Sequence, residues 1–283
     1  MIGIVMLNYN NWQLSIDCIH NIRHHIDTEY NIYLVDNHSS EKMPDVMYRL
    51  IKDGKDLVFL KSEINRGYAA GNNIGIQRAI ADGCSEILIT NNDVIYNDSS
   101  ISNMKHYLSN NVDVGIVGPK IYLPNGELQE INMVSKMTVA GKYFYLLRKT
   151  PFRELSKNFV NRFHGKGTDK NSPFIVYAVS GCCFMVSERA FKYVFPLDEG
   201  TFLYEEENII GARMEKSGLK TVYCTDSVIT HIGGGSTNGF SEFAYNCFME
   251  SEKYYLKEYC HASIFQYLPL YFLRKLYGYY KYK

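Results

Sequence analysis

The sequence predicts an α/β fold in which one mostly parallel sheet is flanked by helices. Two observations predict it. Short apolar runs alternate with helix-like segments over the first hundred residues, as in strands joined by crossover helices. Polar clusters follow three of the strands directly, as happens at the ligand-binding edge of such a sheet. With 283 residues, 46% of them hydrophobic, the chain is long enough to bury a substantial core.

Composition excludes several classes of protein. Thirty basic and thirty acidic side chains cancel, so no net field attracts nucleic acid. Seven cysteines without a Cys-x-x-Cys pair are typical of free thiols in a reducing compartment. The first residues lack the features of a signal peptide, and no apolar run reaches the ~18–20 residues that span a bilayer. We therefore expect a cytoplasmic protein that binds no nucleic acid.

The first half of the chain is expected to contain four strands separated by three helices. Strands are predicted where short apolar runs are bounded by polar residues, and helices where apolar residues recur every three or four positions. The predicted segments, in order, are 2–7 (strand), 12–25 (helix), 32–35 (strand), 44–52 (helix), 57–60 (strand), 69–81 (helix) and 87–90 (strand).

After residue 95 the alternation is looser. We predict a helix at 99–108 and strands at 114–117, 184–186 and 220–224. Residues 135–173 read as a long irregular stretch, which is rich in Lys and Arg. Aromatic residues dominate from Tyr254 onward, and we expect a helical extension over 241–283.

Polar clusters follow the first, second and fourth predicted strands. They are Asn8-Tyr9-Asn10, Asp36-Asn37-His38-Ser39 and Asn91-Asn92-Asp93. Each cluster alone suits a turn or a helix cap. Because parallel strands end at one edge of a sheet, three clusters together favour a shared pocket for a nucleotide-like ligand.

The sequence lacks the common nucleotide and hydrolase motifs. It has no GxxxxGK[ST], no GxGxxG after the first strand, no GxSxG and no HExxH. It does have glycines at 67, 71 and 75, which leave one face of the predicted helix bare. That face allows close approach of a ligand or of a packed strand, and the start of the helix suits phosphate or sugar oxygens.

Three further groups of residues suggest chemistry. Asp93, at a strand end behind two asparagines, suits a hard divalent ion or the N-cap of the next helix. Glu205-Glu206-Glu207 suits a helix N-terminus, and crowding beside aromatic residues should raise the pKa of at least one carboxyl, as a general base requires. His231 precedes Gly233-Gly234-Gly235-Ser236, a loop able to close over a ligand.

In this order the segments resemble family 2 glycosyltransferases of the GT-A fold, particularly those that extend bacterial polysaccharide, rhamnan and O-antigen chains. The resemblance implies a single Rossmann-like sheet in a domain over 1–240, with a nucleotide-sugar-binding half (1–95) and an acceptor and catalytic half (96–240). Residues 241–283 lie outside it. The matching segments are 4–10, 35–40, 65–75, 91–94, 180–181, 202–207, and His231 with Ser236.

The resemblance also implies roles for individual residues. Those expected to hold the nucleoside diphosphate sugar are Tyr9, Asn10, Asp36, Asn37, Arg66, Asn72, Asn91 and Asn92. Asp93 matches the last carboxylate of the family's DxD motif and, with His231, would bind Mg²⁺ or Mn²⁺, although Asn91 leaves one carboxylate fewer. Glu207 falls at the catalytic base and Glu206 beside it, and which of the two acts is left open.

The implied reaction is an inverting transfer of a hexosyl or deoxyhexosyl group from a UDP- or dTDP-linked donor to a glycan or lipid-linked oligosaccharide. Two alternatives remain. A sugar nucleotidyltransferase would carry a Gly-rich loop where this chain has 8–11, and a non-catalytic sugar-nucleotide-binding or scaffold protein would not need Asp93 and Glu207. The basic 142–170 stretch and the Tyr-rich tail suit the inner face of a membrane, or packing on the domain or on a second subunit of a homodimer.

Overall fold

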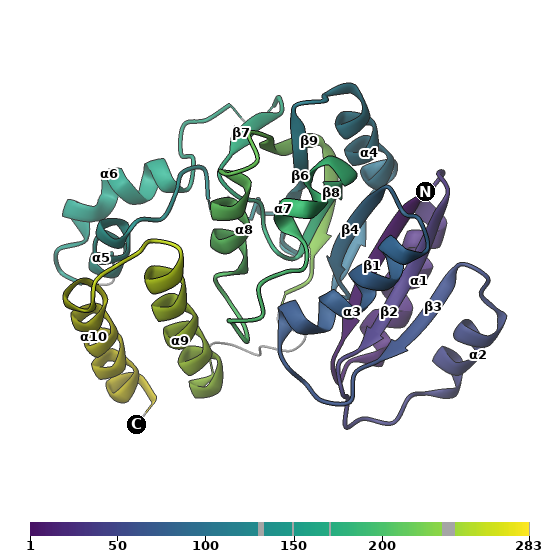
Figure 1. Cartoon of the computed structure of the whole chain (residues 1–283), viewed down its shortest axis with the longest axis horizontal. Helices are drawn as coiled ribbons and strands as arrows, with labels where there is room; N and C mark the ends of the chain where they lie inside the picture. Colours follow the sequence, from purple (N-terminus) through teal and green to yellow (C-terminus); the bar gives the residue numbers. More distant parts are fainter. Residues whose placement is uncertain (130–132, 149, 170, 234–240, 283) are drawn as a thin grey trace.

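The computed structural model describes residues 1–129, 133–148, 150–169, 171–233 and 241–282. Figure 1 shows a central sheet with helices on both faces and a group of helices at one end. The strands pair in the order β3-β2-β1-β4-β8-β6-β9-β5, and β7 also pairs with β9. The strands are β1 (Ile2–Asn8), β2 (Tyr30–Asp36), β3 (Leu57–Lys61), β4 (Glu86–Asn91), β5 (Val94–Tyr96), β6 (Val114–Tyr122), β7 (Phe174–Val176), β8 (Cys183–Ser187) and β9 (Lys220–His231).

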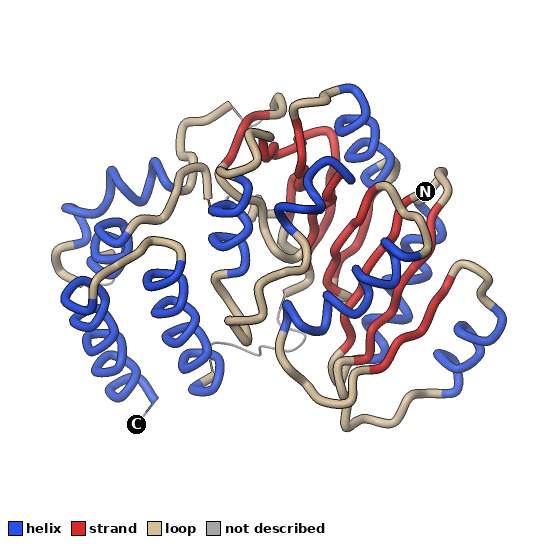
Figure 2. Tube along the Cα trace, in the orientation of Figure 1, coloured by secondary structure: helices blue, strands red, loops and turns tan. Residues whose placement is uncertain are grey.

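The helices alternate with the strands in the first half and cluster in the second (Figure 2). They are α1 (Trp12–His25), α2 (Asp45–Asp53), α3 (Tyr68–Ala81), α4 (Ser100–Asn110), α5 (Val139–Leu147), α6 (Arg153–Phe163), α7 (Phe191–Val194), α8 (Glu206–Met214), α9 (Glu242–Glu258) and α10 (Ile264–Tyr282), with a 3₁₀ turn at Glu188–Ala190. The α/β class predicted from the sequence is confirmed.

The sheet is mixed, with parallel pairing among the strands of the first half of the chain and again between β6 and β9. Strands β3, β2, β1 and β4 are parallel, as crossover helices require. Strand β8 is antiparallel to β4 and β6, and β5 and β7 are antiparallel to β9. The sheet is therefore less parallel than the sequence pattern predicts, because an apolar run reveals a buried strand and not its direction.

Two apolar layers enclose the sheet. On one face α1, α2 and α4 cover the strands through side chains such as Ile19, Met47 and Met104. On the other face α3, α7 and α8 cover them through side chains such as Ile76, Val194 and Met214. Both layers are closed by buried aliphatic residues, so the sheet is a rigid support for the loops at its ends.

The expectation of an irregular stretch at 135–173 is wrong, because α5 and α6 lie within it. Thr138 caps α5 by accepting a hydrogen bond of 3.1 Å from the Gly141 amide. Phe144 and Phe159 stack across the two helices. The helices were missed because Lys142, which reads as a surface charge, is buried on the inner face of α5.

The C-terminal extension is helical, as predicted. Helix α9 begins at a Ser241 cap and α10 returns beside it, contacting both α9 and α5 (Figure 1). We call α9 and α10 the C-terminal hairpin. Among the described residues no helix is long and apolar enough to cross a membrane.

Strand register brings the three polar strand ends together. Asn8 pairs with Asp36 across β1 and β2, and Leu7 pairs with Asn91 across β1 and β4. Val94 of β5 pairs with His231 of β9, which places that histidine next to Asp93. The clusters predicted to share an edge do so.

Candidate active site

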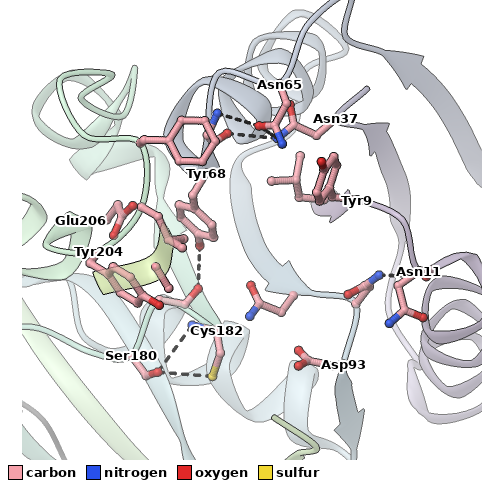
Figure 3. Close-up of a pocket in the computed structure, with 18 of the residues that line it drawn as sticks. Tyr9, Asn11, Asn37, Asn65, Tyr68, Asp93, Ser180, Cys182, Tyr204 and Glu206 are labelled. Carbon is pink, nitrogen blue, oxygen red and sulfur yellow. Dashed lines mark hydrogen bonds between the residues drawn. The ribbon is translucent and has the colours of Figure 1, made fainter. Parts of the chain in front are cut away.

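A cavity of about 580 Å³ opens at this edge of the sheet. Its walls come from the ends of β1, β2 and β4, the start of α3, the segments 180–182 and 202–207, and the start of α9. In Figure 3, Tyr9 and Asn37 lie on one side of the cavity, Glu206 and Tyr204 on the other, and Asp93 between β4 and β5. The predicted site residues that line it are Tyr9, Asn37, Asn91, Asn92, Asp93, Glu206, Glu207 and His231.

Four other predicted residues lie outside the lining. Asn10 has a positive φ of 52°, and its side-chain oxygen accepts from the amides of Ser40 and Glu41. Asp36 is buried and accepts a hydrogen bond of 3.1 Å from the Ser39 amide. Both side chains hold the loop after β2, on which Asn37 depends for its position.

Arg66 and Asn72 also serve the scaffold. Arg66 is exposed and pairs with Glu199 at 2.7 Å. Asn72 is fully buried within α3, where its amide donates to the Tyr68 carbonyl. Their expected contact with a diphosphate or a sugar remains a prediction.

Glycines allow two site segments to meet. Gly67 has a φ of 95°, and a Cβ there would lie 2.1 Å from the Phe202 carbonyl oxygen. That oxygen accepts a 2.9 Å hydrogen bond from the Tyr68 amide, so the first N–H of α3 is already paired. The start of α3 thereby holds the 202–207 segment instead of presenting all its amides to a ligand.

Three buried acceptors in the cavity wall have no hydrogen-bond donor among the described residues. They are Asn37 Oδ1, Glu206 Oε1 and Asp93 Oδ1, the last of which has the His231 imidazole 3.3 Å away without a well-formed hydrogen bond. Leaving such atoms unpaired costs about 1–3 kcal/mol each. Buried polar groups are otherwise almost always paired, so three in one cavity indicate a ligand or ion that supplies donors or positive charge.

Asp93 and His231 form the part of the site suited to a cation. His231 Nε2 lies 3.3 Å from Asp93 Oδ1, and His231 Nδ1 lies 3.2 Å from Gln129 Oε1. No group of three or more His, Cys, Asp or Glu side chains that could hold a metal occurs within the described ranges. A divalent ion here would complete its shell with ligand phosphates and water, as Mg²⁺ commonly does. Ser236 and glycines 234–235, also predicted to act here, lie outside the described residues.

Glu206 and Glu207 open α8 in different surroundings. Burial, together with the neighbouring Glu207, raises the pKa of Glu206 well above its usual value. Burial also raises the pKa of Glu207, but the Gly181 amide opposes this by donating a 3.1 Å hydrogen bond to Glu207 Oε1. The prediction that crowding raises the pKa of a carboxyl is confirmed.

A second cavity of about 420 Å³ meets the first at Tyr204 and Glu207, which line both. Its walls come from α5, α6, the start of α8 and the C-terminal hairpin. Tyr145, Phe248 and Tyr277 provide ring faces, and Arg148 lies at 3.8 Å over the Tyr145 ring. Glu207 therefore stands at the junction of two chambers.

Sequence reasoning missed several residues of the site. Tyr68 lines the first cavity and donates a 2.6 Å hydrogen bond to the Gly181 carbonyl. Ser241 and Phe243, from the C-terminal hairpin, complete the same wall. Tyr68 could have been found from its place directly after Gly67, whereas nothing local in 241–243 marks a site.

The fold is of the GT-A type, with a cavity at the carboxyl ends of its parallel strands, and comparison with known proteins places the chain in a family. A model of glycosyl transferase family 2 matches residues 3–195, which is more than half of the chain. The chain belongs to this family.

Relatives and neighbours agree with this assignment. The chain is 25% identical over 227 residues to the low-salt glycan biosynthesis hexosyltransferase Agl10 of Haloferax volcanii, covering 79% of this chain but only 64% of that relative. Among solved structures, GalNAc-T7 with UDP, GalNAc and Mn²⁺ has a TM-score of 0.62 at 14% identity, covering 91% of this chain and 50% of its own. S. aureus TarS 1-349 with UDP-GlcNAc has a TM-score of 0.56 at 12% identity. The match covers 88% of this chain and 65% of the TarS chain.

Proposed function

We propose that this protein transfers a sugar from a nucleoside diphosphate sugar to a hydroxyl of a glycan acceptor, with inversion at the anomeric carbon. The observation that carries the proposal is the position of Glu207, which lines both the first cavity and the second. The donor occupies the first cavity and the acceptor the second, so one carboxylate reaches the acceptor hydroxyl beside the donor's anomeric carbon.

The first cavity suits a UDP- or dTDP-linked donor. Tyr9 offers a ring, 41% exposed, for stacking on a base, and the unpaired Asn37 Oδ1 can accept from a base or ribose group. The solved neighbours GalNAc-T7 and TarS hold UDP and UDP-GlcNAc respectively, which supports this class of donor. Asn91 and Asn92, at the end of β4, would face the diphosphate.

Asp93 and His231 are the residues that would hold Mg²⁺ or Mn²⁺. The unpaired Asp93 Oδ1 and the nearby imidazole fit such an ion, because carboxylate oxygen and imidazole nitrogen are both suitable ligands. When bound, the ion would offset the negative charge of the departing diphosphate. One carboxylate is a small donor set, so we expect the ion to bind together with the donor's phosphates.

Glu207 is the base we propose, in preference to Glu206. Its Oε1 is oriented by the Gly181 amide, which also favours the ionised form. Glu207 takes the proton of the acceptor hydroxyl as that oxygen bonds to the anomeric carbon. The bond from that carbon to the diphosphate oxygen breaks, and its electrons leave with the nucleoside diphosphate. Burial and the neighbouring Glu207 raise the pKa of Glu206 well above its usual value, and its Oε1 has no donor among the described residues.

The acceptor we propose is a lipid-linked glycan, met at a membrane surface by the end of the molecule that carries α5, α6 and α10. Exposed apolar side chains recur along α10, and two more stand at the start of α6. They are Phe265, Phe272, Leu273, Leu276 and Tyr280 on α10, and Phe152 and Leu155 at α6. Apolar residues beside Lys and Arg are typical of surfaces that lie on anionic membranes.

The reaction is tested by nucleoside diphosphate release from UDP-glucose, UDP-N-acetylglucosamine and dTDP-rhamnose with Mn²⁺, with and without octyl glycosides. We expect wild-type release from one donor, and Glu207→Gln to lower kcat about 10²–10⁴-fold because the proton acceptor is lost. Glu206→Gln, the matched control, should stay within about tenfold of wild type, since glutamine mimics a protonated carboxyl.

The outcomes separate the alternatives. Equal activity of Glu207→Gln and wild type would remove Glu207 from the mechanism. Donor binding without any release would favour a non-catalytic sugar-nucleotide-binding protein, and pyrophosphate release from a nucleoside triphosphate with a sugar phosphate would favour a nucleotidyltransferase.

A further inference from the structure

We infer that the C-terminal hairpin positions the catalytic base, through a buried ionic network that holds the backbone turn before Glu207. The network consists of Lys142 on α5, Glu205 in the turn, Glu252 on α9 and Arg274 on α10, and we call it the brace. The inference rests on the proposed function, because it assigns positioning residues to the same site.

The turn needs external support. Tyr204 has a φ of 76° and Glu205 a φ of 68°, so two consecutive residues with side chains adopt left-handed backbone. Each such residue costs on the order of 1–3 kcal/mol and persists only where its surroundings impose it. Glu206 and Glu207 follow directly as the first residues of α8, so their direction depends on this turn.

The C-terminal hairpin contacts the turn at two points and reaches it at a third through Lys142 of α5. Ser251 donates a 2.8 Å hydrogen bond to the Leu203 carbonyl oxygen. Phe248 packs edge-on against Tyr204. Glu252 approaches Lys142, whose ammonium donates to Glu205. Residues 248, 251 and 252 share one face of α9, so a single helix face holds the whole turn.

The brace is buried and balanced in charge. Lys142 Nζ bonds Glu205 and lies 3.6 Å from Glu252 Oε1, and Arg274 donates two hydrogen bonds of 3.0 Å to Glu252. All four residues are buried, and they form part of the wall of the second cavity. Burial lowers the pKa of Lys142, but the two carboxylates outweigh it and raise the pKa. Asn208 Nδ2 satisfies the other oxygen of Glu205 at 2.8 Å.

Stability alone does not explain four buried charges. Apolar side chains of the same volume often stabilise a fold as well or better, because taking ions out of water is costly. An ionic network with defined geometry does fix the direction of its members. Here the member that is fixed, Glu205, lies two residues before the proposed base. The brace therefore supplies the external support that the turn requires.

The test compares Lys142→Met with the double variant Lys142→Met/Glu205→Gln. The single change leaves a buried carboxylate without its cation, so it should lower both Tm and kcat. The double change removes that lone charge and should restore most of the Tm. It still lacks the brace, so kcat should stay at least about tenfold below wild type while KM for the donor changes less than about threefold.

Amide hydrogen exchange gives a readout that does not need turnover. We expect faster exchange of amides 203–208 in the double variant, and in Ser251→Ala, which removes only one hydroxyl. Lys136→Met is the matched control, because Lys136 pairs with Glu215 where both side chains are partly exposed. That variant should leave kcat and exchange unchanged.

A double variant with wild-type kcat would overturn the inference, and so would unchanged exchange at 203–208 in both the double variant and Ser251→Ala. A wild-type protein that releases no nucleoside diphosphate would instead overturn the proposed function, and the exchange experiment would still decide whether the hairpin holds the turn.

Discussion

Two adjacent carboxyl groups, Glu206 and Glu207, acquire different properties within one turn of helix. Glu206 is buried, with an oxygen that has no donor among the described residues, while Glu207 is half-buried and oriented by a backbone amide. The difference arises from their surroundings, since the side chains are identical. Burial raises the pKa of both groups, but only Glu207 is held by the Gly181 amide, which is why we propose it and not Glu206 as the base.

The raised pKa of Glu206 predicts how stability depends on pH. Folding favours its protonated form, so its contribution to stability is full below the ordinary carboxyl value of 4.5 and is lost as pH rises through the folded-state pKa. Glu206→Gln cannot lose a proton. We expect the free energy of unfolding of this variant to increase relative to that of wild type as the pH is raised from 5 to 8.

Urea unfolding at pH 5, 6, 7 and 8 measures this difference. Glu63→Gln, at an exposed position, should follow the wild-type curve at every pH. A Glu206→Gln curve that runs parallel to wild type over the whole range would contradict the raised pKa.

At the residue scale, sequence reasoning found eight of the cavity residues and misjudged the surroundings of four. Asn10 and Asp36 were predicted correctly to lie at strand ends, yet their side chains hold the neighbouring loop. Lys142, Glu252 and Arg274 received no individual role. Their partners lie far away in the sequence, and a buried ion pair leaves no local pattern.

Among the elements, α3 shows how closely a helix can approach a sheet. A Cβ at Gly71 would lie 2.6 Å from Leu7 Cδ1, and one at Gly75 would lie 2.6 Å from Val5 Cγ1. The glycine face therefore packs on β1 and β2, which was one of the two interpretations the spacing allowed. This close packing fixes the distance between α3 and the sheet, and with it the positions of Tyr68 and Asn37 in the cavity wall.

Gly75→Val should destabilise the protein without altering the chemistry. The added side chain would overlap Val5 and Val35, and overpacking of this kind costs about 1–3 kcal/mol. We expect the free energy of unfolding in urea to fall by about 2–3 kcal/mol. Gln77→Val adds the same side chain on the exposed face of α3 and should cost less than about 1 kcal/mol. Equal losses in the two variants would show that helix propensity, and not close packing, governs position 75.

Elements with regular periodicity could be predicted well. Helix α1 has the predicted bounds, Trp12–His25, because its apolar residues face the sheet at helical spacing. Helices α5 and α6 could not be predicted, because they lack a regular apolar spacing. They are held instead by aromatic contacts with each other and by a buried lysine on α5. The direction of β8 likewise depends on pairing with β4 and β6, which a single sequence does not reveal.

The whole molecule has two unlike ends. Helix α2 lies at the end of the parallel half, and α5, α6 and α10 lie at the other (Figure 1). The exposed apolar side chains of α10 belong to the second end, which we propose meets a membrane.

Flotation with vesicles tests that orientation. We expect the full chain to float with phosphatidylcholine vesicles that contain phosphatidylglycerol, and less with phosphatidylcholine alone. Phe272→Ser/Leu276→Ser should abolish flotation by removing apolar contact with the lipid. Tyr48→Ser, at an exposed site on α2, should float like wild type. The surface would instead be a subunit contact if the full chain did not float and sedimentation velocity showed a dimer. In that case the Phe272→Ser/Leu276→Ser variant should be a monomer.

The C-terminal hairpin has one side toward the solvent and the other against the turn that precedes the proposed base. Binding of a membrane or a protein to the solvent-facing side of the hairpin would also make the side that packs on the turn more rigid. This follows because α10 is connected to the turn through Arg274, Glu252 and Lys142. Contact of a membrane with the hairpin would then increase the rate of sugar transfer. The enzyme would consume its sugar donor mainly where an acceptor is present.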